Sequence, residues 1–220
     1  MSGSFLKSWS TLFSVSDEQA MWRVKMQDDP QAFAQLVRRW EGPIQALCTR
    51  MVGDGHRGED LAQETFARVF ARRKDYQSEA RFSTFLWRVA LNLCYDELRR
   101  IKRRRESFLE DESAGGDERG QVAETPGPDL RLVEQERAEA VRGALLQLAE
   151  PYRAVVVLRH YEGLKFREIG EVLEIPEGTA KSRMAEALSQ LSQILSHTLI
   201  DEGEVKCKPQ NRPSRELLVI

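Results

Sequence analysis

Hydroxyl, basic and small side chains gather in residues 176–183, PEGTAKSR, where a helical pattern restarts after a turn. Residues 161–175 before them, YEGLKFREIGEVLEI, contain one short amphipathic helix. Two helices joined by a tight turn, with basic residues opening the second, are typical of a helix-turn-helix that places its second helix in a DNA major groove. Lys and Arg can bind guanine or phosphate there, and Ser or Thr can contact either. The side chains predicted to face DNA are Arg167, Thr179, Lys181, Ser182 and Arg183.

The apolar positions of this motif predict how its two helices pack. The residues expected to face inward are Ile169, Val172, Leu173, Ile175, Ala180 and Met184. Gly170 is the small residue that would let the helices cross closely. The alternative is a helical hairpin that serves only packing.

A second cluster, of aromatic and basic side chains, lies in residues 81–105, RFSTFLWRVALNLCYDELRRIKRRR. Aromatic residues Phe82, Phe85 and Trp87 stand at its start, and a basic block ends it. Aromatic faces stack on unpaired bases for about 1–3 kcal/mol per base, while arginines follow the phosphates. The alternative is that Phe82 and Phe85 belong to a core and that the basic block is a solvated helix end.

Helical periodicity surrounds this cluster. Ser16 and Gln19 form a capping box for a helix through Met26, and Asp29-Pro30 opens the next. We expect further helices over 59–73 and from a cap at Ser83 onward. No segment alternates with a period of two for long enough to predict a sheet. The expected fold is therefore all-α.

A polar, acidic segment divides the chain into two parts. Residues 106–128 include EDESAGGDERGQVAETPGP, whose composition predicts a flexible linker. We therefore predict two small helical domains, of which the second ends in the helix-turn-helix. The five expected parts are an N-terminal extension, a first domain, the linker, a second domain and a C-terminal tail, over 1–16, 17–105, 106–128, 129–198 and 199–220.

Composition limits the class of protein. The 220 residues are 41% hydrophobic and 31% charged, with a net charge of −2, and no apolar run is long enough to span a bilayer. A secretory signal is not expected, which favours a cytoplasmic protein. The widely spaced Cys48, Cys94 and Cys207 look like residues of a reducing compartment, and the three histidines show no ligand spacing. We therefore expect no metal.

The sequence also lacks the signatures of catalysis. It has neither a phosphate-cradling P-loop nor a set of nucleophile and base residues. We expect a protein that is not an enzyme, with no cofactor and no small-molecule substrate. At the N-terminus, Phe5, Leu6, Trp9, Leu12 and Phe13 share one helical face. That face either rests on the body or binds a partner or membrane.

These motifs together carry a family resemblance. The chain resembles the bacterial extracytoplasmic-function (ECF) sigma factors, the small two-domain specificity subunits of RNA polymerase. The segments DPQAFAQLVRRWEGPIQALCTRMVGD, EDLAQETFARVFARR and RFSTFLWRVALNLCYDELRR are similar to that family's second conserved region. The segment LLQLAEPYRAVVVLRHYEGLKFREIGEVLEIPEGTAKSRM resembles its fourth region. Together they cover most of residues 20–195.

The resemblance implies roles for individual residues. Asn92 would capture a flipped base of the −10 promoter element, near the strand-separation point at Phe85 and Trp87. The −10 and melting residues would be Phe82, Phe85, Trp87, Arg88, Asn92, Asp96, Arg99, Arg100 and Arg103. The −35 element would be read by Arg167, Thr179, Lys181, Ser182 and Arg183. Core polymerase would be bound through Asp60, Leu61, Gln63, Glu64, Phe66, Val69 and Phe70.

The resemblance implies partners as well. They are the clamp coiled coil of the largest polymerase subunit, the polymerase flap, promoter DNA in duplex and locally melted form, and an anti-sigma factor. Two other functions stay open from the residues: a DNA-binding regulator that works without polymerase, and an interaction protein that titrates a partner.

Two positions depart from the family pattern. Glu174 stands where a turn glycine is usual, and a strained or altered turn is expected there. Met184-Ala185-Glu186 follows Arg183 where further arginines are usual, so Glu186 would repel phosphate if it faces the duplex.

Overall fold

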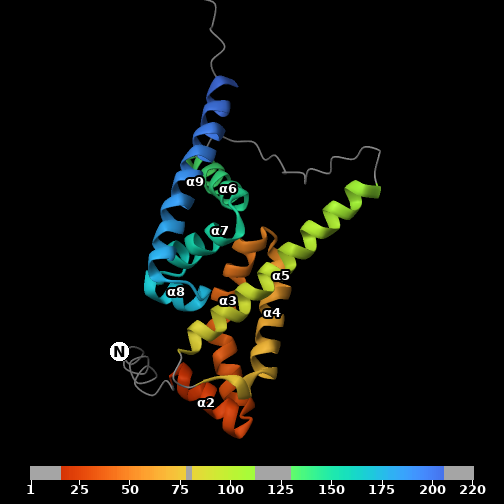
Figure 1. The fold of residues 1–220 in the computed structure, drawn as a ribbon, viewed down its shortest axis with the longest axis vertical. Coiled ribbons are helices and arrows are strands. Elements are labelled where there is room, and N and C mark those ends of the chain that lie inside the picture. The colour runs from red at the N-terminus through yellow and green to blue at the C-terminus, as the bar shows by residue number, and fades with distance from the viewer. Residues whose placement is uncertain (1–15, 78–80, 112–129, 206–220) are drawn as a thin grey trace, which may run out of the picture.

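The computed structural model describes residues 16–77, 81–111 and 130–205, with side chains for 16–77, 81–106 and 137–196. Within these ranges the chain is helical and contains no strand, which confirms the all-α prediction (Figure 1). We call residues 16–111 the first half and residues 130–205 the second half. Among the described residues, no helix is both long and apolar enough to cross a membrane.

The first half consists of helices α2 (Asp17–Gln27), α3 (Pro30–Val52), α4 (Gly55–Ala71) and α5 (Phe82–Asp111). The caps predicted from sequence are present: Ser16 forms a capping box with Gln19, and the Asp29 carboxylate accepts hydrogen bonds from the first turn of α3. Gly53 ends α3 with φ of 84°, a conformation that favours glycine.

Helix α4 begins earlier than the predicted residue 59. Asp54 caps it, accepting a hydrogen bond from the Arg57 backbone N–H at 2.7 Å. Glycine is needed inside this helix because a Cβ at Gly58 would lie 2.2 Å from the Thr49 hydroxyl oxygen. The absence of a side chain at Gly58 thus allows α4 to pack closely against Thr49 of α3.

Helix α5 differs from prediction at both ends. It begins at Phe82, so Ser83 lies inside the first turn and is not its cap. It continues to Asp111, and residues 106–111 of the expected linker are therefore helical. Good helix formers and an ion pair between Lys102 and Glu106, 3.9 Å apart, support this extension. The remainder of the predicted linker lies outside the described residues.

The second half contains α6 (Leu130–Gln147), α7 (Glu150–Val156) with a following π-helical turn η2 (Val157–Tyr161), α8 (Phe166–Leu173) and α9 (Glu177–Val205). The C-terminal tail was predicted to begin at residue 199, whereas α9 continues without a break to Val205. No glycine or proline interrupts the chain between residues 179 and 202. Residues 1–15 and 206–220 lie outside the described residues.

The two halves pack against each other, with α3 contacting α6 and α7, and α5 contacting α8 (Figure 1). Arg153 of α7 is buried at this junction and donates to the backbone oxygens of Met51, Leu146 (2.5 Å) and Leu148 (3.0 Å). These carbonyls lie at the C-terminal ends of α3 and α6, where a cation is favourable. Burial lowers the pKa of Arg153, because the charged form is disfavoured away from water.

Candidate nucleic-acid interface

Asn92 lines a hollow between α4 and α5. Its volume is about 380 Å³, and its lining consists of Arg68, Arg72, Val89, Asn92, Tyr95, Asp96 and Arg99. Three predicted −10 residues, Asn92, Asp96 and Arg99, therefore lie together. Arg68 and Arg72 were missed, although their exposed i, i+4 positions on a predicted helix were a usable signal.

The hollow combines hydrogen-bonding groups with positive charge. The exposed Asn92 amide can both donate and accept hydrogen bonds. Burial raises the pKa of Tyr95 to about 12, although the nearby positive charge of Arg183 opposes the shift, so the phenol is neutral at physiological pH. Arg99 lies 3.6 Å from the Asp96 carboxylate. Such a site can hold one flat polar group and a phosphate beside it.

Two of the three predicted stacking aromatics are core residues. Phe82 is fully buried and Trp87 is 3% exposed. Their rings meet Trp40 edge-on, with centroids 6.4 Å and 5.6 Å away. A ring enclosed in this way cannot stack on a base, so the stacking role predicted for Phe82 and Trp87 is corrected to support of the α3–α5 packing. Phe85 is half-buried and partly accessible.

The basic end of α5 extends away from the body of the protein (Figure 1). Arg99, Arg100 and Arg103 are exposed along it. The Arg100 guanidinium is 3.6 Å from Glu97. Arg88, at the other end of the helix, instead contacts α8, where its guanidinium lies 2.9 Å from the Glu174 carboxylate.

The face predicted to bind polymerase divides into two layers. Asp60, Gln63 and Glu64 are exposed on α4. The apolar members lie beneath them: Leu61, Phe66 and Val69 are buried, and Phe70 is half-buried against Phe33. Only the exposed layer can contact a partner, whereas the buried layer holds α4 against the core.

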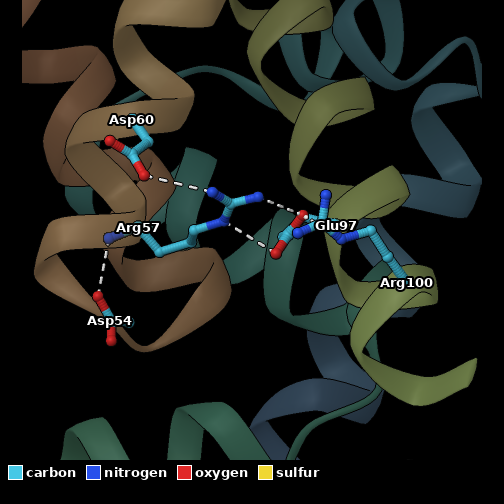
Figure 2. Close-up of polar contacts among 5 residues, drawn as sticks. All are labelled: Asp54, Arg57, Asp60, Glu97 and Arg100. Carbon is cyan, nitrogen blue, oxygen red and sulfur yellow. Dashed lines mark hydrogen bonds and ion pairs between the residues drawn. The ribbon is translucent and has the colours of Figure 1, made fainter. Parts of the chain in front are cut away.

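An ion pair between α4 and α5 holds the exposed polymerase-binding face of α4 in place relative to the Asn92 hollow (Figure 2). Arg57 donates from Nε and Nη2 to the two carboxylate oxygens of Glu97, both at 2.8 Å, and pairs with Asp60 at 3.2 Å. The hydrogen bonds from Arg57 hold the pKa of Glu97 below its ordinary value. Glu97 was not among the predicted site residues, because its partner Arg57 lies 40 residues away and no local pattern in the sequence joins the two.

In the second half, α8 and α9 form the predicted helix-turn-helix. Ile169, Val172 and Ala180 are buried between them. A Cβ at Gly170 would lie 2.7 Å from the Ile175 backbone oxygen, so the turn requires glycine there. Glu174 adopts φ of 55°, the left-handed conformation in which glycine is favoured, as the departure from the family pattern suggested.

The predicted −35 residues cluster on the first turns of α9, except for Arg167 on α8. Lys181 and Ser182 are exposed, Thr179 and Arg183 are half-buried, and Arg167 is exposed. Their charges are balanced within the motif: Lys181 pairs with Glu177 at 2.7 Å, and Arg167 with Glu171 at 3.3 Å. This surface is polar and carries exposed side chains at the start of a helix, as major-groove binding requires.

Comparison with known proteins finds one family in both halves of the chain. Residues 36–105 match Sigma-70 region 2, and residues 138–191 match Sigma-70, region 4. The ECF RNA polymerase sigma factor SigW of Bacillus subtilis is 36% identical over 160 residues, or 71% of this chain and 84% of SigW. The chain belongs to the ECF sigma factor family.

Two solved structures share the fold. CnrH in complex with the cytosolic domain of CnrY has a TM-score of 0.60 at 22% identity, covering 83% of this chain and 99% of CnrH. RpoE of Bartonella quintana, in complex with the anti-sigma factor NepR, has a TM-score of 0.56 at 21% identity, covering 74% and 96%. The region 2 match contains the Asn92 hollow, and the region 4 match contains the helix-turn-helix.

Proposed function

We propose that this chain is a sigma subunit that binds core RNA polymerase, recognises −10 and −35 promoter elements and promotes DNA opening. The observation that carries the proposal is that one chain contains both sigma-70 matches, each with one candidate DNA surface. A regulator that works without polymerase would need only the second surface.

In the first half, the Asn92 hollow is the proposed site of −10 recognition. The Asn92 amide would hydrogen-bond a base taken out of the stack, with Phe85 beside it. Arginine side chains around the hollow and along α5 would bind the phosphates. The residues retained in this role are Phe85, Arg88, Asn92, Asp96, Arg99, Arg100 and Arg103, joined by Arg68 and Arg72.

In the second half, the first turns of α9 would enter the major groove of the −35 element. Lys181 and Ser182 are exposed there and would contact bases or phosphates. Thr179 and Arg183 are half-buried and would need small side-chain shifts to reach DNA. Arg167 would bind a phosphate from α8.

The energy of opening indicates why core polymerase is needed. A bubble of about ten base steps costs on the order of 14 kcal/mol. Two captured bases would return about 2–6 kcal/mol. The exposed side chains Asp60, Gln63 and Glu64 would therefore dock on the clamp coiled coil of the largest subunit, and the second half would bind the flap. Within that assembly the chain supplies sequence choice, not catalysis.

Regulation by an anti-sigma factor belongs to the same proposal. RpoE of similar fold was solved bound to the anti-sigma factor NepR, and we extend that kind of partner to this chain. A cytoplasmic location would follow from work on polymerase and DNA.

Permanganate footprinting of open complexes tests the proposed −10 site. Core polymerase carrying the Asn92→Ala chain should give about tenfold fewer reactive thymines, because one base contact is worth about 1–3 kcal/mol. Gln193→Ala, an amide removed from the exposed side of α9 beyond the region 4 match, is the control and should leave the signal unchanged. Equal bubbles in both variants would remove Asn92 from the mechanism.

A further inference from the structure

Two arginines, Arg81 immediately before α5 and Arg88 within it, are engaged by the helix-turn-helix half. The Arg81 guanidinium lies 2.5 Å from the Glu168 carboxylate. Arg88 donates to the Glu171 backbone oxygen at 2.7 Å and pairs with the Glu174 carboxylate at 2.9 Å. These contacts border a cleft of about 740 Å³ between α5 and α8. We call Glu168, the Glu171 carbonyl and Glu174 the acidic edge of α8. Its oxygen atoms face the guanidinium groups of Arg81 and Arg88.

Glu174 is unusual in both its conformation and its contact. Apart from Asp28, it is the only residue other than glycine with a positive φ among those the structure describes. A side chain in this conformation costs on the order of 1 kcal/mol, which a glycine would avoid. What the glutamate adds at this turn is its carboxylate, and that carboxylate reaches Arg88 in the other half of the chain.

The engaged arginines lie next to the proposed −10 site. Arg88 precedes Asn92 by four residues on α5, so both belong to one side of the helix. A guanidinium that meets a carboxylate and a carbonyl has fewer donors available for phosphate. The half-buried Arg183 of α9 is also close enough to Tyr95, in the lining of the Asn92 hollow, to influence its pKa. The packed arrangement therefore brings parts of both candidate DNA surfaces together.

We infer that the acidic edge of α8 is an internal binding surface for Arg81 and Arg88, and that it competes with the DNA backbone for them in the free chain. The competition rests on the proposed function, whereas the surface itself rests only on the contacts between the start of α5 and α8. The ion pairs are largely exposed: the side chains of Arg81 and Glu174 are 68% and 69% accessible. Exposed pairs are weak and screened by salt, so polymerase or DNA can displace them.

The double variant Glu168→Gln/Glu174→Gln tests this surface. Gln at position 168 can still cap α8, because its side-chain oxygen can accept the hydrogen bond from the Lys165 N–H, as Glu168 does at 2.8 Å. The matched control is Glu171→Gln/Glu177→Gln, which makes the same change in net charge. The carboxylates of Glu171 and Glu177 pair within the helix-turn-helix, with Arg167 and Lys181, and not with α5.

Two readouts on the free, full chain separate the parts of the inference. Hydrogen-exchange mass spectrometry of α8 should show faster exchange in the double variant than in the control, and a fluorescent single-stranded oligonucleotide should bind about threefold to tenfold more tightly. Unchanged exchange in α8 would overturn the surface. Faster exchange with no gain in binding over the control would overturn the competition with DNA. Run-off transcription with core polymerase is measured in parallel; no start-site selection by the wild-type chain would instead refute the proposed function.

Discussion

The two candidate DNA surfaces are built in different ways. In the first half, Asn92 lies in a hollow between two helices that a partly buried ion pair, Arg57 with Glu97, holds in register. In the second half, Lys181 and Ser182 project from one exposed helix, and the ion pair of Lys181 stays within that helix. A hollow suits a single base taken out of the stack, whereas an exposed helix suits an intact groove. The first surface depends on tertiary packing, and the second depends mainly on local sequence.

The largest expected effect tests that dependence on packing. Glu97→Ala leaves the Arg57 guanidinium without its bidentate partner, and we expect the free energy of unfolding to fall by about 1.5–2 kcal/mol, the lower part of the range for hydrogen bonds to a charged group. Urea denaturation followed by circular dichroism measures the change. Asp96→Ala removes a neighbouring carboxylate that is 61% exposed and should cost under about 0.5 kcal/mol. Equal losses in the two variants would show that the pair does not hold α4 on α5.

The same ion pair predicts a pH dependence. Hydrogen bonds from Arg57 lower the folded pKa of Glu97 below its ordinary value of 4.5. Its contribution to stability is therefore complete above that value and is lost as the pH falls through the folded pKa. Unfolding curves from pH 6 to pH 3 should fall more steeply for wild type than for Glu97→Gln. Parallel curves would contradict the assignment.

In the second half, the effect of a single side chain should fall on DNA binding and not on stability. Lys181→Ala should weaken binding of a −35 duplex about tenfold and reduce the slope of its salt dependence by about one ion. Fluorescence anisotropy across a salt series measures both quantities, with unfolding as the control for fold. A change in affinity without any change in slope would remove Lys181 from the phosphate contacts.

Glycine substitutions at Glu174 and at Glu171 should change the free energy of unfolding in opposite directions. Glu174→Gly relieves backbone strain while losing an exposed ion pair, and should raise the free energy of unfolding by about 0.5–1 kcal/mol. Glu171→Gly, the same substitution inside α8, should lower it by about 1 kcal/mol. Thermal unfolding of the two variants gives the answer, and a destabilised Glu174→Gly would mean that the ion pair outweighs the strain.

The smallest expected effect concerns Glu186. This exposed carboxylate lies on α9 and accepts a hydrogen bond from Gln190 at 2.8 Å. If α9 enters the groove, Glu186→Gln should tighten binding to the −35 duplex about twofold, because one repulsive charge near phosphate is removed. The same anisotropy assay detects this change, and unchanged binding would place Glu186 away from the DNA.

The contrast between the halves also explains what sequence could predict. The helix-turn-helix follows from local signals, such as the Gly170 crossing and the inward Ile169 and Val172, and the structure has each of these features. Caps at Ser16 and Asp29 are equally local and were predicted correctly. Such signals lie within a few residues of the structure that they specify.

Errors arose where tertiary packing decides. Aromatic residues at helical spacing are equally consistent with a core and with a stacking surface. Phe82 and Trp87 belong to the core because they pack against Trp40 of another helix. One difference had a local cause: acidic composition suggested a linker, whereas helix propensity extends α5 to Asp111. The contacts between the start of α5 and α8 join residues more than 80 positions apart, so no local sequence pattern predicts them.

The central claim is that both surfaces act together on one promoter when mounted on polymerase. The most direct measurement is run-off transcription by purified core enzyme with this chain, followed by sequencing of the RNA 5′ ends on a genomic template. The account predicts defined start sites, each preceded by two shared DNA elements, and a loss of those starts with Asn92→Ala. Start sites identical to those of core enzyme alone would contradict it.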